Sequence, residues 1–183
     1  MAWKYLDNPD PKRDRLGLCL LAGIMVVHYW AQLFNLGEVF GAGKVISASL
    51  LFGPLLGLLF PWVASLVTFY AAKLLLAKDT ERPKLKKVYA FLVHSLRPLL
   101  FAGLIQFIEL AFFGESAFHY RWDVFMVLKT LLMAGFLVLW FLYTRRLLGG
   151  WKLWPAMASL SLLSGFGISF LIFRGIFGLP MVS

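Results

Sequence analysis

The chain alternates between long runs of apolar residues and short polar segments. A helix needs about 20 apolar residues to cross the roughly 30 Å hydrocarbon core of a bilayer. Runs of this length occur five times, and each predicts one spanning helix, over residues 16–36, 55–77, 88–113, 122–143 and 153–177. The predicted fold is all-α: a polytopic membrane helix bundle that forms one transmembrane domain over residues 1–183.

The start of the second apolar run has two interpretations. It extends from Leu50 to Ala77, which is longer than one upright helix needs, and two prolines interrupt its first part. Either the helix is tilted and kinked, or residues 45–54 form a short re-entrant or interfacial piece. The spanning part is predicted to begin near Leu55, after a glycine-containing connector over residues 38–49.

The first apolar run follows a polar lead, an arrangement shared with secretory signal peptides. This run is longer than the usual apolar core of a signal peptide, and no good Ala-x-Ala cleavage site follows it. We therefore expect an uncleaved first helix.

Composition supports a membrane location. Hydrophobic residues make up 61% of the chain and charged residues 15%, against about 45–50% and about 25% in soluble domains. The net charge of +9 arises from Lys and Arg in short segments between apolar runs, so it indicates topology rather than nucleic-acid binding.

The positions of the 18 Lys and Arg residues predict an orientation. Most lie before the first span, around the loop at residues 78–87, or in the turn at residues 145–152. Cytoplasmic loops carry the excess of basic residues. The N-terminus is therefore predicted to face the cytoplasm and the C-terminus the outside.

Three polar residues inside the predicted third and fourth spans form the candidate site. Gln106 and Glu109 share one helix face, and Lys129 lies at a similar depth on the adjacent antiparallel span. We predict that Glu109 and Lys129 pair, directly or through Gln106. The pair has three interpretations: a structural ion pair, two side chains that snorkel outward separately, or part of a proton or ion path.

A basic residue also lies deeper in the third span. Arg97 precedes Pro98, whose ring frees a backbone carbonyl one turn earlier. Either Arg97 or Ser95 donates to the freed carbonyls, or Arg97 extends to cytoplasmic headgroups.

Basic residues in two predicted cytoplasmic segments are candidate contacts for anionic lipid headgroups. They are Arg82, Lys84, Lys86, Lys87, Arg145 and Arg146. For the loop at residues 78–87, the alternative is a charge cluster that only stops translocation.

Two stripes of small residues predict close helix packing, either within the chain or at a dimer face. One consists of Gly53 and Gly57, the other of Ser161, Gly165 and Ser169. No nucleophile elbow, phosphate-binding loop, zinc spacing or carboxylate pair occurs in the sequence. We therefore predict no enzyme activity, no catalytic residue, no cofactor and no metal site, and no small-molecule ligand is identified.

Two stretches resemble the Yip domain family of Ypt/Rab-interacting, five-helix membrane proteins and their bacterial relatives. Residues 86–100, Lys-Lys-Val-Tyr-Ala-Phe-Leu-Val-His-Ser-Leu-Arg-Pro-Leu-Leu, are similar to the third helix of that family after its basic loop. Residues 132–156 are similar to its fourth helix, basic turn and fifth helix. The resemblance implies a role in membrane organisation or a trafficking-like process. Rab binding does not carry over, because the long cytoplasmic tail of the eukaryotic members is missing.

The sequence thus favours a non-enzymatic protein of a bacterial cytoplasmic membrane that contacts lipids and other membrane proteins. One alternative is an accessory subunit of a larger membrane complex. Another is a small transporter component that uses the Glu109–Lys129 pair.

Overall fold

The computed structural model describes residues 12–75, 83–120, 122–148 and 152–177. Within these ranges the chain is helical almost throughout, and five stretches are long and apolar enough to span a membrane. In chain order the elements are α2 (Lys12–Leu33), α3 (Leu36–Phe40), α4 (Ala42–Leu75), α5 (Leu85–Ser95), α6 (Arg97–Phe113), the 3-10 turn η1 (Gly114–Phe118), α7 (Val124–Leu147) and α8 (Trp154–Phe177). The predicted five-span helix bundle is confirmed.

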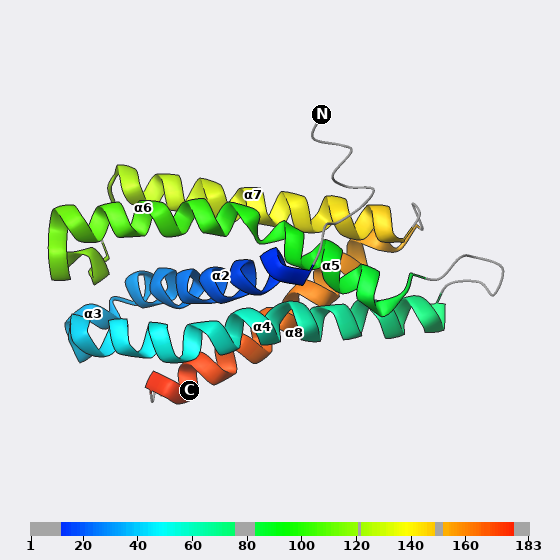
Figure 1. Ribbon diagram of the computed structural model, residues 1–183, viewed down its shortest axis with the longest axis horizontal. Coiled ribbons are helices and arrows are strands. Elements are labelled where there is room, and N and C mark those ends of the chain that lie inside the picture. Colours follow the sequence, from blue (N-terminus) through cyan, green and yellow to red (C-terminus); the bar gives the residue numbers. More distant parts are fainter. Residues whose placement is uncertain (1–11, 76–82, 121, 149–151, 178–183) are drawn as a thin grey trace.

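Helices α2, α4, α6 and α7 run along one common direction, with α2 between α4 and α6, and α8 crosses the bundle obliquely (Figure 1). Helix α7 packs beside α6, and α8 packs against both α4 and α7. One end of the bundle carries α3 and η1, and we call it the η1 end. The opposite end carries the start of α5 and the last turn of α7, and we call it the basic end (Figure 1).

The second span differs from the prediction. Residues 42–49, expected in a connector, are helical, and α4 runs without a break from Ala42 to Leu75. Residues 45–54 are therefore part of the second helix and not a re-entrant piece. Pro54 and Pro61 lie inside this helix; prolines are tolerated in membrane helices where neighbouring groups satisfy the freed backbone. The true connector is shorter: Asn35, with φ of 53°, and Gly41, with φ of 78°, flank the single turn of α3.

The third spanning helix is interrupted next to Pro98, where the sequence predicts a disturbance of its backbone hydrogen bonds. Helix α5 ends at Ser95, and α6 begins at Arg97 with Pro98 in its first turn. Proline has no N–H to donate one turn back, so the α-helical ladder stops there. Leu96 turns the chain, its N–H donating to the Val93 carbonyl at 3.1 Å.

Helices α2 and α4 cross with their backbones in contact. A Cβ added to Gly23 would lie 1.9 Å from the Gly53 carbonyl oxygen, and one added to Gly57 would lie 1.8 Å from the Cys19 carbonyl oxygen. On α8, a Cβ added to Gly165 would lie 2.8 Å from the ring of Phe60. Gly53, Gly57 and Gly165 therefore serve packing within the chain rather than a dimer face.

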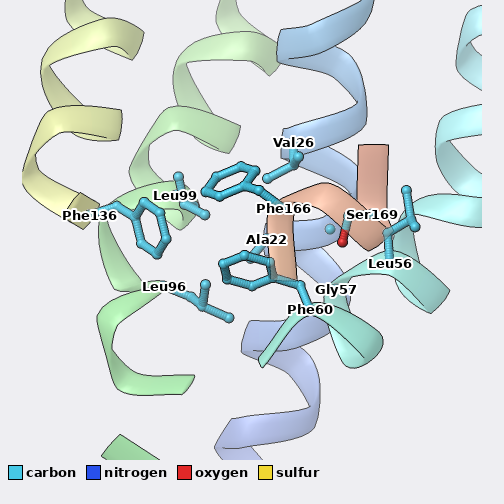
Figure 2. A pocket seen from close by; sticks show the side chains of 11 residues that line it. Ala22, Val26, Leu56, Gly57, Phe60, Leu96, Leu99, Phe136, Phe166 and Ser169 are labelled. Carbon is cyan, nitrogen blue, oxygen red and sulfur yellow. The ribbon is translucent and has the colours of Figure 1, made fainter. Parts of the chain in front are cut away.

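The core between these helices is mostly aromatic and aliphatic. Phe60 of α4 lies 5.2 Å from the Trp140 ring of α7 and 5.0 Å from the Phe166 ring of α8, centroid to centroid. A small cavity of about 20 Å³ remains beside them (Figure 2). Ser169 is the only one of its lining residues with a polar side chain, so a water molecule there would find few of the two to four partners it needs. The cavity is a packing gap and not a polar binding site.

We predict that Gly57→Ala destabilises the bundle by about 1–3 kcal/mol, because the new methyl group would overlap the α2 backbone. Thermal unfolding in detergent measures the effect. Gly167→Ala on α8 is the matched control, since a Cβ there meets nothing within 4 Å. An equal loss of stability in Gly57→Ala and Gly167→Ala would contradict the close α2–α4 contact.

Candidate functional site

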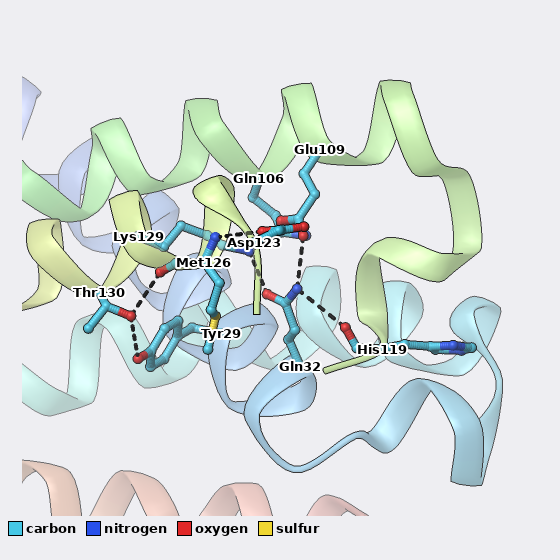
Figure 3. Close-up of polar contacts among 9 residues, drawn as sticks. All are labelled: Tyr29, Gln32, Gln106, Glu109, His119, Asp123, Met126, Lys129 and Thr130. Carbon is cyan, nitrogen blue, oxygen red and sulfur yellow. Dashed lines mark hydrogen bonds and ion pairs between the residues drawn. The ribbon is translucent and has the colours of Figure 1, made fainter. Parts of the chain in front are cut away.

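The three predicted site residues meet inside the bundle near the η1 end. Lys129 projects from α7, and Gln106 and Glu109 project from α6 toward it (Figure 3). Lys129 and Glu109 form an ion pair, and the Lys129 Nζ donates to Gln106 Oε1 at 2.7 Å. The structure thus contains both the direct contact and the Gln106 contact expected from the sequence.

A fourth residue, Gln32 of α2, completes the cluster. Its Oε1 accepts from Lys129 Nζ at 2.5 Å, and its Nε2 donates to Glu109 Oε1 at 2.9 Å. The same Nε2 lies 3.4 Å from the backbone carbonyl oxygen of His119, just after η1 (Figure 3). We call Gln32, Gln106, Glu109 and Lys129 the polar cluster. It joins α2, α6 and α7.

The sequence interpretation missed Gln32. The available signal was a polar residue in the last turn of the first apolar run, at the same end of the bundle as Glu109 and Lys129. Depth alone does not identify it, because a Gln near a helix end also fits an interfacial position. Its role becomes visible only when α2 is known to lie between α4 and α6.

The ion pair finds its hydrogen-bond partners inside the protein. An ammonium group has three N–H donors, and Lys129 has three acceptors: Gln32, Gln106 and Glu109. Both oxygens of the Glu109 carboxylate also accept hydrogen bonds. Lys129, Glu109 and Gln32 are 0% exposed, so the cluster is charge-balanced and closed to the surroundings. One buried group of the cluster, Gln106 Nε2, has no hydrogen-bond partner among the described residues.

Further polar contacts support the helix that carries Lys129. Asp123 caps the start of α7 by accepting from the Met126 N–H at 3.0 Å. One turn later the Thr130 hydroxyl donates to the Met126 carbonyl at 2.8 Å and lies 3.5 Å from the Tyr29 hydroxyl of α2. These contacts fix the first turns of α7 relative to α2 (Figure 3).

The candidate lipid contacts lie at the basic end, away from the polar cluster. Lys84, Lys86 and Lys87 are exposed around the start of α5, and Arg145 and Arg146 are exposed in the last turn of α7. The Arg145 guanidinium lies 5.8 Å from the centre of the Trp154 ring. Arg82 lies outside the described residues.

In the described part of the chain, no group of three or more His, Cys, Asp or Glu side chains is arranged to hold a metal ion. Comparison with protein-family models, with curated proteins and with solved structures finds no match for this chain.

We predict that Glu109→Gln and Lys129→Met each destabilise the bundle by about 3–5 kcal/mol, because each leaves a buried charge without its counter-ion. The double variant is expected to lose about 1–3 kcal/mol less than the sum of the single losses. Reversible unfolding in detergent measures the free energy of unfolding of the unchanged chain, of each single variant and of the double variant. Glu115→Gln, at an exposed carboxylate of η1, is the control and should leave stability unchanged. Strictly additive losses would contradict the pairing.

A second prediction separates the two glutamines. Gln32→Leu removes an acceptor from Lys129 and a donor from Glu109, whereas Gln106→Leu removes only an acceptor from Lys129. Leaving buried groups unsatisfied costs about 1–3 kcal/mol, so Gln32→Leu should be the more destabilising. The same unfolding measurement tests this order, and a larger loss for Gln106→Leu would reverse the assignment.

Proposed function

We propose that this chain is a non-enzymatic integral membrane protein that acts through contacts with lipids and with other membrane proteins, in membrane organisation or a trafficking-like process. Its described residues are mostly spanning helix joined by short connections. The surfaces available for function are therefore the apolar sides of the helices and the two ends of the bundle.

The observation that carries this proposal is the closed state of the polar cluster. A residue that relays ions or protons through a membrane must reach a chain of polar groups or a water-filled cavity. Lys129 and Glu109 instead use their hydrogen bonds on each other and on two buried glutamines. This arrangement favours a structural role for the pair over the alternative of a small transporter component.

An accessory subunit of a larger membrane complex is the second candidate. One observation favours it: only 22% of the most apolar window of α7 is buried within the chain, against 56% for α2. Leu131, Val138 and Leu142 of α7 are among the exposed apolar side chains. Such a helix is available to pack against another subunit as well as against lipid.

We also propose that the chain is a bacterial relative of the Yip domain family, located in the cytoplasmic membrane with its N-terminus inside. Two observations support this assignment: the presence of five spans, and a helix break at Arg97 and Pro98 within the stretch that resembles the third helix of that family. The exposed Lys and Arg residues at the basic end fit the positive-inside rule for a cytoplasmic face.

Purification in a mild detergent tests the contact function. We expect at least one other membrane protein to co-purify in a fixed ratio, and photo-crosslinkers at exposed positions such as Leu131 and Val138 to capture it. The matched control is a crosslinker at Phe136, which is buried in the core. A monodisperse chain with no crosslinked protein from any exposed face would contradict a partner contact.

The orientation has its own test. In a variant with Cys19 replaced by Ser, Lys152→Cys should be labelled only from the cytoplasmic side and Lys44→Cys only from outside, since both positions are exposed and lie at opposite ends of the bundle. The reverse labelling pattern would overturn the predicted topology.

A further inference from the structure

A groove opens between α4 and α5, in the half of the bundle toward the basic end. The two helices pack against each other (Figure 1), and the groove is lined by Trp62 and Ser65 of α4 and by Leu85, Lys86 and Tyr89 of α5. Its volume is about 440 Å³, within the range of about 300–1,000 Å³ that is typical of ligand sites. The groove therefore has room for a ligand, unlike the cavity of about 20 Å³ in the core.

The lining of the groove is mostly apolar. Ser65 is buried, and its hydroxyl donates to the Pro61 carbonyl of the same helix. The Tyr89 hydroxyl lies 3.7 Å from the Cys19 Sγ of α2, on the inner side of α5. Lys86 is the only charged group among the described residues that line the groove.

A contact across the core fixes the depth of the α4 wall. The Phe60 ring of α4 packs against the Trp140 ring of α7, with the centroids 5.2 Å apart. Trp62 lies two residues, or about 3 Å, farther toward the basic end, and 53% of its surface is exposed. The deeper part of the groove thus lies within the spanning part of the bundle, beside an exposed indole ring.

The charged part of the groove lies closer to the basic end. Phe91 of α5 packs edge-on against Tyr143 of α7, with the centroids 5.6 Å apart, and Tyr143 lies about one turn before the end of α7. Lys86 precedes Phe91 by five residues, or about 7.5 Å, toward the basic end. Lys86 therefore lies at the level where α7 ends, and the groove leads from there to the apolar wall formed by Trp62.

The sequence around Lys86 is strongly basic. From Lys73 to Lys87 it holds six Lys and Arg residues and two acidic residues, a net charge of +4. An excess of positive charge therefore remains however these side chains pair with one another. The acidic side chains that the structure describes lie near the η1 end: Glu38, Glu109, Glu115 and Asp123. The charged part of the groove is complementary to an anion, and clusters of Lys and Arg at a membrane surface attract anionic lipids.

We propose that the α4–α5 groove binds one anionic phospholipid, with its phosphate against Lys86 and one acyl chain along the wall formed by Trp62. A phospholipid fits because its parts have the same order as those of the groove: a charge at the end of the span and an apolar chain below it. The proposal rests on the proposed contact function and specifies its lipid part.

Native mass spectrometry of the full chain in detergent measures the binding of single lipids. Phosphatidylglycerol should bind more tightly than phosphatidylcholine. Lys86→Gln should weaken phosphatidylglycerol binding about fivefold and leave phosphatidylcholine binding unchanged, because it removes only the charge. Trp62→Ala should weaken the binding of both lipids, because it removes part of the apolar wall. Unchanged phosphatidylglycerol binding in Lys86→Gln would overturn the proposal.

Lys87→Gln is the matched control. Lys87 is an exposed cation next to Lys86, but it is not among the residues that line the groove. Its loss should change phosphatidylglycerol binding little, whereas an unspecific attraction to the basic segment would make the two losses equal and would contradict the groove. Displacement of phosphatidylglycerol by excess inorganic phosphate would also contradict it, since this would indicate a site for a free anion.

A measurement on the unmodified chain guards against misfolding of the variants. Phosphatidylglycerol with a photoreactive group in its acyl chain should label the segments at residues 62–65 and 85–89, and labelling confined to other segments would contradict the site.

The result is separable from the partner test. A protein partner without lipid selectivity would overturn this site alone, and lipid selectivity without a partner would overturn only the protein-contact part of the proposed function. The absence of both would overturn the proposed function together with the site.

Discussion

The need to neutralise one buried ammonium group organises the η1 end of this bundle. Transfer of a lone charge into hydrocarbon is unfavourable by several kcal/mol on insertion scales. Lys129 is 0% exposed, so it must find its counter-ion and its acceptors inside the protein. It finds one partner on α2 and two on α6. Because lipid chains supply no hydrophobic force between helices, such a directional contact selects which helices are neighbours and in what register.

Close backbone packing complements the polar cluster along the rest of the bundle. Gly23, Gly53 and Gly57 bring α2 and α4 together at a distance that any side chain would prevent. In the middle, Phe60, Phe136 and Trp140 fill the space between α4 and α7. The polar cluster joins α2, α6 and α7, and the glycine contacts join α2 and α4. Helix α2 takes part in both sets of contacts, which explains why it is the central helix. At the basic end, by contrast, the described Lys and Arg side chains of α5 and of the last turn of α7 are exposed.

The sequence predicts the helices well and their junctions less well. Apolar length alone reveals five spans, because hydrocarbon requires every backbone group to be satisfied within a helix. The predicted start of the second spanning helix was wrong. Gly43, Pro54 and Pro61 resemble connector residues, but the membrane helix α4 accommodates all three. The Glu109–Lys129 contact follows from matched depth on antiparallel neighbours. The contacts of Gln32 do not follow, since they depend on which non-adjacent helices touch.

Spin-label distances across the η1 end test the central claim that Lys129 holds α2, α6 and α7 together. Labels at exposed Leu33 of α2 and exposed Leu128 of α7 report this end, and labels at Leu16 and Leu142 report the opposite one. In Lys129→Met, the account predicts a longer and broader Leu33–Leu128 distance distribution with an unchanged Leu16–Leu142 distribution. Unchanged distributions at both ends would show that helix packing alone sets the arrangement, and would contradict the account.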